Sequence, residues 1–169
     1  EGCPVFAGEP ILRVTAPVAE AQLIETTLLA TVLFQTSVAS KAARVVEAAG
    51  ARPVIELGGR RAHGPEAAVH AARAAYLAGC QGTSNVEAGS RFGIPVSGTM
   101  ANSWVMAHSD ERSAFTRYME VRGWESVLLI DTYDAVAEAR LIVRAGLRPA
   151  AVRVDSGDLA GLSKAVRSV

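Results

Sequence analysis

The sequence predicts an α/β fold made of consecutive βαβ units. Short apolar runs alternate with helical segments from residue 51 to residue 169, the order expected for parallel strands joined by helices. Half of the residues are hydrophobic, much of this content is Ala and Val, and only 5% of the residues are aromatic. Such a composition suits helices packed closely on a parallel sheet. Polar side chains follow the apolar runs, where the strands of such a sheet end.

The first fifty residues are predicted to form two short extended segments and a helical region. Residues 5–6 and 11–14 have the extended pattern. Residues 18–49 contain almost no helix breaker and carry apolar side chains at helical spacing, with Gly50 as a C-cap. Because the stretch is long enough for two helices, we expect a change of direction near residues 34–36.

The remaining elements follow in alternation. Strands are predicted at residues 54–57, 94–97, 126–131 and 150–155, and helices at residues 65–77, 84–91, after Gly98, 133–146 and 159–169. Both an open doubly wound sheet and a closed (β/α) barrel are compatible with this order.

Charge and cysteine content exclude several classes of protein. Seventeen Lys and Arg balance 17 Asp and Glu, which argues against a general nucleic-acid binder and against a polybasic membrane-surface segment. Cys3 and Cys80 are too few for a disulfide framework and do not have metal-ligand spacing with the histidines. No signal peptide is recognisable, and the most apolar stretch, residues 28–34, is about a third of a membrane span. We expect a soluble, cytoplasmic protein.

The polar residues at the predicted strand ends indicate a binding site. They occur at residues 60–63, 82–85, 98–103, 131–134 and 153–158. Arginines and helix N-termini with Ser, Thr and Gly suit anionic groups, above all phosphates, and carboxylates suit Mg²⁺ or ribose hydroxyls. The alternative is that the Asp and Ser residues are only helix N-caps. Residues 58–64 do not have the dinucleotide-binding glycine pattern, and no P-loop lysine follows a glycine run.

Eight short motifs, which span nearly the whole chain, form a specific combination. They are residues 9–10, 34–36, 39–42, 56–65, 82–86, 93–101, 131–134 and 153–159. Together they resemble the nicotinate phosphoribosyltransferase family. The resemblance implies an incomplete (β/α) barrel of the type II phosphoribosyltransferase kind, with part of a small N-terminal α+β domain. Residues 1–50 would then end the N-terminal domain and its connecting helices, and residues 51–169 would begin the barrel.

The family's reaction converts nicotinate and phosphoribosyl pyrophosphate to nicotinate mononucleotide and pyrophosphate, in NAD salvage. The resemblance implies Mg²⁺, ATP as a co-substrate and a homodimer. It assigns catalytic positions to Asn102, Asp131 and Asp155, and no metal site made by protein ligands alone. It assigns substrate contacts to Arg60, Thr83, Ser84, Ser103, Arg153, Ser156 and Gly157. Because the family's phosphate-binding glycine turns lie on later barrel strands, we expect the 169 residues alone to be inactive.

Two positions qualify the resemblance. Asn102 stands where the family normally has the histidine that ATP phosphorylates, and an amide cannot become a phosphohistidine. This puts the ATP-coupled step in doubt. Ser84 stands where nicotinamide phosphoribosyltransferases place an aspartate, so nicotinate is favoured over nicotinamide. The alternatives are a nicotinamide phosphoribosyltransferase and a non-catalytic relative that binds a nucleotide.

Overall fold

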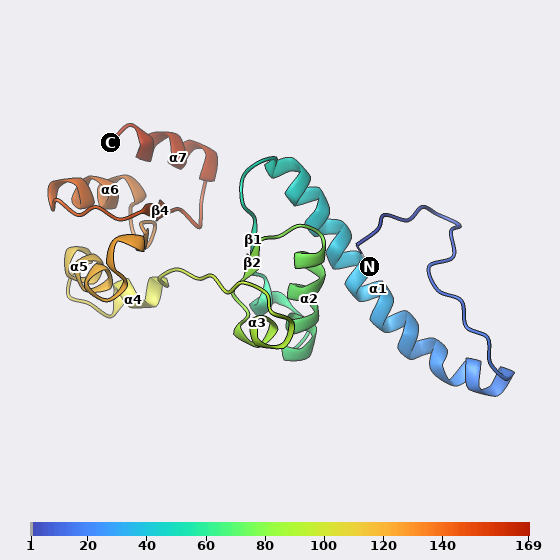
Figure 1. Cartoon of the computed structure of the whole chain (residues 1–169). Coiled ribbons are helices and arrows are strands. Elements are labelled where there is room, and N and C mark those ends of the chain that lie inside the picture. The colour runs from blue at the N-terminus through green and yellow to red at the C-terminus, as the bar shows by residue number, and fades with distance from the viewer. Residues whose placement is uncertain (1) are drawn as a thin grey trace. The chain divides into compact units, whose positions relative to one another are not determined.

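The computed structural model describes residues 2–169 and divides them into two compact units (Figure 1). The first unit ends at Gly98, and the second is Thr99–Val169. The domain boundary predicted at residue 50 stays a prediction. The alternation of short strands with helices confirms the α/β class.

The first unit begins with a single long helix, α1 (Val18–Ala49). The predicted change of direction at residues 34–36 is therefore wrong. Residues 18–49 contain neither Gly nor Pro, so nothing interrupts the helical hydrogen bonds before Gly50. Gly50 has a φ of 60° and donates its N–H to the carbonyls of Val46 and Glu47, which confirms it as the C-cap. The predicted extended segments at residues 5–6 and 11–14 form no strand.

Among residues 2–169, α1 is the one helix that is long and apolar enough to cross a membrane by length and composition. Its most apolar window of 18 residues has a mean hydropathy of 1.3. The prediction from residues 28–34 alone therefore underestimated the length of the apolar stretch. One such helix is weak evidence for a membrane span, and the cytoplasmic location stays a prediction.

The rest of the first unit packs α2 (Pro65–Leu77) against α1 and against two short strands (Figure 1). The strands β1 (Ile55–Glu56) and β2 (Gly82–Thr83) pair in parallel, and α3 (Val86–Phe92) follows β2. The core consists of Val69, Ala72, Ala88 and Ile94. β2 was not predicted. It exists because Gly82 lacks a side chain: a Cβ there would lie only 2.7 Å from the carbonyl oxygen of Pro95.

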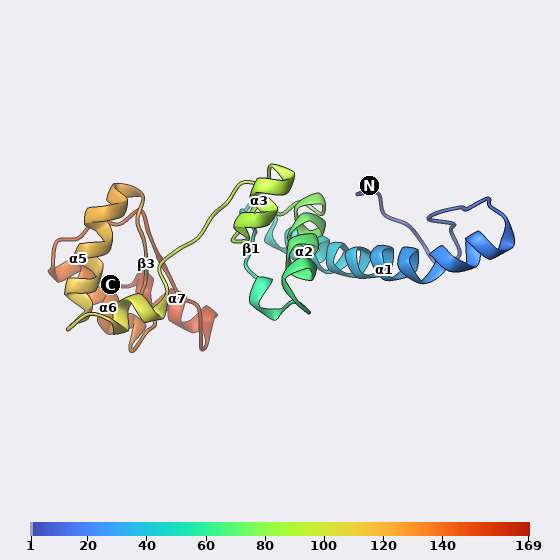
Figure 2. The ribbon, with the colours of Figure 1, turned by 90° about the horizontal axis from the view of Figure 1, so that it is seen from below.

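The second unit contains the clearest predicted strand. Its elements are α4 (Asn102–Met106), α5 (Glu111–Arg122), β3 (Val127–Leu129), α6 (Ala135–Arg144), β4 (Ala151–Arg153) and α7 (Leu159–Arg167). β3 and β4 are parallel, with Val127 opposite Ala151 and Leu129 opposite Arg153. Figure 2 shows α5 and α6 beside β3. They cover it with a core that includes Phe115, Leu128, Ile130 and Ile142.

The strand pairing in the described residues lies within each unit. In the described residues β1 pairs only with β2, and β3 only with β4, which gives two separate two-stranded sheets. Residues 94–97, predicted as a strand, contribute one isolated bridge between Thr83 and Val96.

Candidate functional site

The polar cluster of the second unit lies at the carboxyl ends of β3 and β4. Asp131 follows the strand that contains Leu129, and its Oδ2 accepts hydrogen bonds from the Asp155 N–H and the Ser156 hydroxyl, both at 2.7 Å. Because β3 and β4 are parallel, their ends meet at one edge of the sheet. The predicted proximity of Asp131 to Asp155 is therefore confirmed. The predicted place of Arg60 beside them stays a prediction, since Arg60 belongs to the first unit.

Arg153 forms the cationic part of this cluster. Its Nη2 lies 2.9 Å from Asp155 Oδ1, and its Nη1 donates to Thr99 Oγ1 at 2.5 Å. The Arg153 side chain is 28% exposed and that of Asp155 is 38% exposed. A partly exposed guanidinium held in a fixed orientation can bind an anionic oxygen with its remaining donors.

Asp131 also has an oxygen that no protein donor satisfies. Its Oδ1 is buried and has no hydrogen-bond partner in the part of the chain that the structure describes. A buried unsatisfied carboxylate oxygen is costly, and such an atom is normally satisfied by an ordered water, an ion or a ligand. The cluster thus presents one fixed cation and one unsatisfied anionic oxygen at the same sheet edge.

Three further predicted site residues, Asn102, Ser103 and Gly157, belong to the same unit as this cluster. Asn102 Oδ1 accepts a long hydrogen bond of 3.5 Å from the Thr132 hydroxyl. Asn102 is exposed and is the first residue of α4, whereas Ala101 is the N-cap, so Asn102 is not a capping residue. Ser103 is exposed on the same helix. Gly157 has a φ of 73°, which a non-glycine residue rarely adopts, and it turns the chain after Ser156.

Three other polar residues at predicted strand ends are helix N-caps. Asp134 accepts from the N–H groups of Val136 and Ala137, Asn85 from that of Ala88, and Asp158 from that of Gly161. The capping interpretation is confirmed at these positions. At each position one side-chain oxygen, Oδ1, holds the start of the helix.

In the first unit, Glu56 connects the ends of β1 and β2. Its Oε2 accepts from the Thr83 hydroxyl at 2.6 Å, and its Oε1 accepts from the Gly58 N–H. Its backbone oxygen accepts from the N–H of Ser84 at 2.9 Å. Sequence reasoning missed this role, and the only signal was a charged residue within an apolar run. Glu56 fixes the turn that precedes Arg60.

The predicted substrate-binding residues of the first unit differ in accessibility. Thr83 is fully buried, and its hydroxyl donates to Glu56 and accepts from the Asn85 N–H at 3.0 Å. Ser84 and Arg60 are exposed. The substrate contacts of all three stay predictions, and Ser84 and Arg60 have the accessibility that such a contact needs.

The second unit holds a buried titratable group that sequence reasoning missed. Glu138 in α6 is 0% exposed, and its Oε1 accepts from the Tyr133 N–H at 3.0 Å. Burial raises the pKa of Glu138 from its ordinary 4.5 to about 7. The backbone amides of Tyr133 and Asp134 act against this shift, while a hydrogen bond and charge repulsion from Glu111 add to it.

This shift predicts a pH-dependent stability. The folded chain binds the Glu138 proton more tightly than the unfolded chain does, so the stabilisation is fully present below pH 4.5 and is lost as the pH rises through about 7. We expect the free energy of unfolding to fall by about 2–3 kcal/mol over that interval. Glu138→Gln should remove this part of the slope in denaturant unfolding. A Glu120→Gln control, which removes an exposed carboxylate of α5, should retain it; equal slopes in wild type and Glu138→Gln would contradict the assignment.

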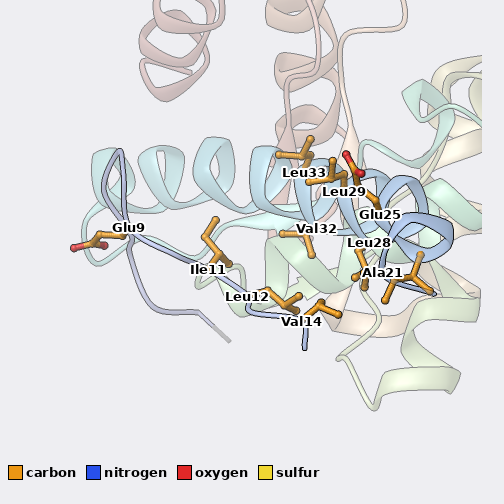
Figure 3. A pocket seen from close by; sticks show the side chains of 11 residues that line it. Glu9, Ile11, Leu12, Val14, Ala21, Glu25, Leu28, Leu29, Val32 and Leu33 are labelled. Atoms are coloured by element: carbon orange, nitrogen blue, oxygen red, sulfur yellow. The ribbon is translucent and has the colours of Figure 1, made fainter. Parts of the chain in front are cut away.

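An apolar groove lies away from the strand ends. It runs between residues 9–14 and the first half of α1, and it is lined mainly by aliphatic side chains (Figure 3). Among the described residues that line it, Glu9 and Glu25 are the charged ones. The groove has no pairing of acid, base and cation comparable to the cluster at β3 and β4, so it is not the candidate site.

Metal binding by protein ligands alone is not indicated. Within residues 2–169, no group of three or more His, Cys, Asp or Glu side chains is arranged to hold a metal ion. The charged cluster instead lies at the carboxyl ends of parallel strands, which is where α/β proteins commonly bind ligands.

Comparison with known proteins shows which family the chain belongs to. The model of the nicotinate phosphoribosyltransferase (NAPRTase) family matches residues 53–167, and the chain belongs to this family. It is 48% identical over 176 residues to the nicotinate phosphoribosyltransferase of Bacillus subtilis, with 100% of this chain and 36% of that protein covered. It is 46% identical over 174 residues to nicotinate phosphoribosyltransferase pncB2 of Mycobacterium tuberculosis, with 99% and 37% covered.

A solved structure is also similar. The crystal structure of human nicotinic acid phosphoribosyltransferase matches with a TM-score of 0.83 at 30% identity, covering 99% of this chain and 45% of that chain. The chain spans a little over a third of the length of the two bacterial relatives, 36% of the Bacillus subtilis protein and 37% of the Mycobacterium tuberculosis protein.

Proposed function

We propose that the chain is part of an enzyme that forms nicotinate mononucleotide and pyrophosphate from nicotinate and phosphoribosyl pyrophosphate. The observation that carries this proposal is the cluster of Asp131, Arg153 and Asp155, which lies at residues where the family motifs match. The reaction is inferred from membership of the family. The cluster provides the positive and negative side chains that this reaction needs.

The chemistry of this transfer matches the cluster. As pyrophosphate leaves the ribose, positive charge develops on the ribose C1 and negative charge on the leaving oxygen. Carboxylates beside the ribose stabilise the first charge, and Oδ1 of Asp131 is the unsatisfied carboxylate oxygen. The Arg153 guanidinium, fixed by Thr99 and Asp155, stabilises the second. Because both groups are already oriented, little reorganisation is needed in the transition state.

Mg²⁺ fits the same residues as a companion of the pyrophosphate. This ion is commonly bound by one or two carboxylates together with substrate phosphates and water. Asp131 has a free oxygen for it, and Asp155 is the second carboxylate at the same strand ends. When bound, Mg²⁺ would neutralise the charge that develops on the leaving pyrophosphate.

The proposal extends to the complete polypeptide. We infer an incomplete (β/α) barrel for residues 51–169, a cytoplasmic homodimer and ATP as a co-substrate. The support is the family match over residues 53–167 and the similarity to the human structure.

Product formation by the complete polypeptide tests the function. The assay supplies Mg²⁺, phosphoribosyl pyrophosphate and either nicotinate or nicotinamide, and separates the mononucleotides by chromatography. We expect nicotinate to be used at least about tenfold better, a difference of 1.4 kcal/mol. Faster use of nicotinamide would favour the alternative base, and substrate binding without product would favour a non-catalytic nucleotide-binding relative.

The asparagine at position 102 leads to a prediction about ATP consumption. An asparagine cannot accept a phosphoryl group as a histidine can, so we expect the complete polypeptide to form nicotinate mononucleotide without stoichiometric release of ADP. Asn102→His should raise the ratio of ADP to nicotinate mononucleotide toward one, because a neutral imidazole is nucleophilic. Asn102→Gln keeps an amide, which cannot accept a phosphoryl group, at the same position and serves as a control. A ratio near one in the unsubstituted protein would mean that another residue accepts the phosphoryl group.

A further inference from the structure

Glu138 is a fully buried carboxyl group that the proposed reaction does not use. It lies on the buried face of α6 together with Ala135, Ala139 and Ile142. Burying a carboxyl group on such a face costs free energy unless specific hydrogen bonds compensate for the lost water. The partners of Glu138 therefore indicate what its presence achieves.

One partner is the turn that carries Asp131. The Oε1 of Glu138 accepts from the Tyr133 N–H at 3.0 Å, and Tyr133 is the second residue after Asp131. Tyr133 is 67% exposed, so its backbone N–H, and not packing of its side chain, anchors this part of the turn. Asp134 fixes the end of the turn through the N–H groups of Val136 and Ala137, at 3.0 and 2.9 Å.

The other partner is Glu111 on α5, which packs against α6. Oε2 of Glu138 has no hydrogen-bond donor among the described residues when both carboxyl groups are ionised. Burial, and after it a hydrogen bond and charge repulsion from Glu111, raises the pKa of Glu138 to about 7. Glu138 thus joins α5 to the turn that follows β3.

We propose that Glu138 is a positioning residue for the phosphoribosyl transfer, because its buried carboxyl group holds the 131–134 turn that orients Asp131. The proposal rests on the proposed function. Asp131 must keep Oδ2 on the Asp155 N–H and the Ser156 hydroxyl so that Oδ1 stays at the strand end. A turn released at Tyr133 loses a hydrogen bond two residues after Asp131, and small displacements of a catalytic group lower the rate strongly.

Two substitutions in the complete polypeptide separate this role from simple core packing. Glu138→Gln keeps an oxygen that accepts from Tyr133 and gains an N–H donor for Glu111. Glu138→Leu has a similar size but no acceptor. We expect Glu138→Leu to lower kcat about 10- to 100-fold with little change in KM for nicotinate. Glu138→Gln should stay within about threefold of the unsubstituted protein, as the conservative replacement that rescues the contact.

Amide hydrogen exchange without substrates gives a readout independent of activity. In Glu138→Leu, the peptide covering residues 131–134 should exchange at least about tenfold faster, while the second half of α6 should be unchanged. Ile142→Ala, which opens the same buried face without touching the turn, is the control and should leave both kcat and exchange at residues 131–134 unchanged.

The outcomes decide the proposal in each case. Loss of kcat and faster turn exchange in Glu138→Leu, with both restored in Glu138→Gln, supports it. Unchanged turn exchange in Glu138→Leu, or an equal loss of kcat in Ile142→Ala, overturns it. If the unsubstituted protein makes no nicotinate mononucleotide, the proposed function fails, and the exchange measurement still decides whether Glu138 holds the turn.

Discussion

Asp131→Asn is expected to lower kcat/KM for nicotinate mononucleotide formation by about 10³-fold, which corresponds to about 4 kcal/mol of transition-state stabilisation. The asparagine side chain has the same shape as aspartate. Its oxygen can accept from the Asp155 N–H and the Ser156 hydroxyl in place of Oδ2, so the two strand ends stay connected. What is lost is the negative charge beside the developing positive charge on the ribose.

The control for this prediction is Asp134→Asn. It makes the same change of carboxylate to amide three residues later, and asparagine is an equally good N-cap for α6. We expect Asp134→Asn to keep kcat/KM within about threefold, because Asp134 holds the helix and does not face the reaction. If Asp131→Asn retained full activity, or if both variants lost activity equally, Asp131 would not have the proposed role. Steady-state kinetics on folded, matched preparations measures both.

Ser84→Asp is expected to raise KM for nicotinate about 100-fold. Ser84 is exposed directly after β2, and its N–H is fixed by the backbone oxygen of Glu56. If the predicted contact is correct, the new carboxylate lies beside the carboxylate of the bound base. Two like charges in a partly desolvated site repel each other unless one is protonated.

Nicotinamide provides the internal comparison for this variant. It lacks the carboxylate, so Ser84→Asp should leave its use unchanged or improve it. Ser90→Asp adds the same charge to an exposed position of α3 and should change neither substrate. Competition between the two bases in one reaction measures the ratio directly. An unchanged ratio in Ser84→Asp would show that Ser84 does not contact the ring substituent.

The elements that could be predicted from the sequence are those with strong local signals. α6 combines an Asp134 cap with buried residues at helical spacing, and the apolar run before Asp131 predicts β3. The approach of Asp131 to Asp155 follows from parallel strands whose ends share an edge. The continuity of α1 was missed, because length alone suggested two helices although the stretch contains no breaker.

Features that depend on contacts distant in the sequence could not be predicted. β2 is a Gly-Thr pair that becomes a strand through its pairing with β1 and the close approach of Pro95. Glu138 looks like an ordinary polar helix residue until it is placed on the face shared with Ala135 and Ile142. The partners of Arg153 also depend on tertiary structure, since Thr99 lies 54 residues earlier.

The most direct test of the account is a crystal structure of the complete polypeptide with nicotinate mononucleotide. The central claim is that the ends of β3 and β4 bind the reacting part of the nucleotide. We expect a ribose hydroxyl to lie within hydrogen-bond distance of Asp131 Oδ1, with Arg153 still held by Asp155. A nucleotide bound elsewhere, with Asp131 Oδ1 and Arg153 in contact only with protein or water, would contradict the claim.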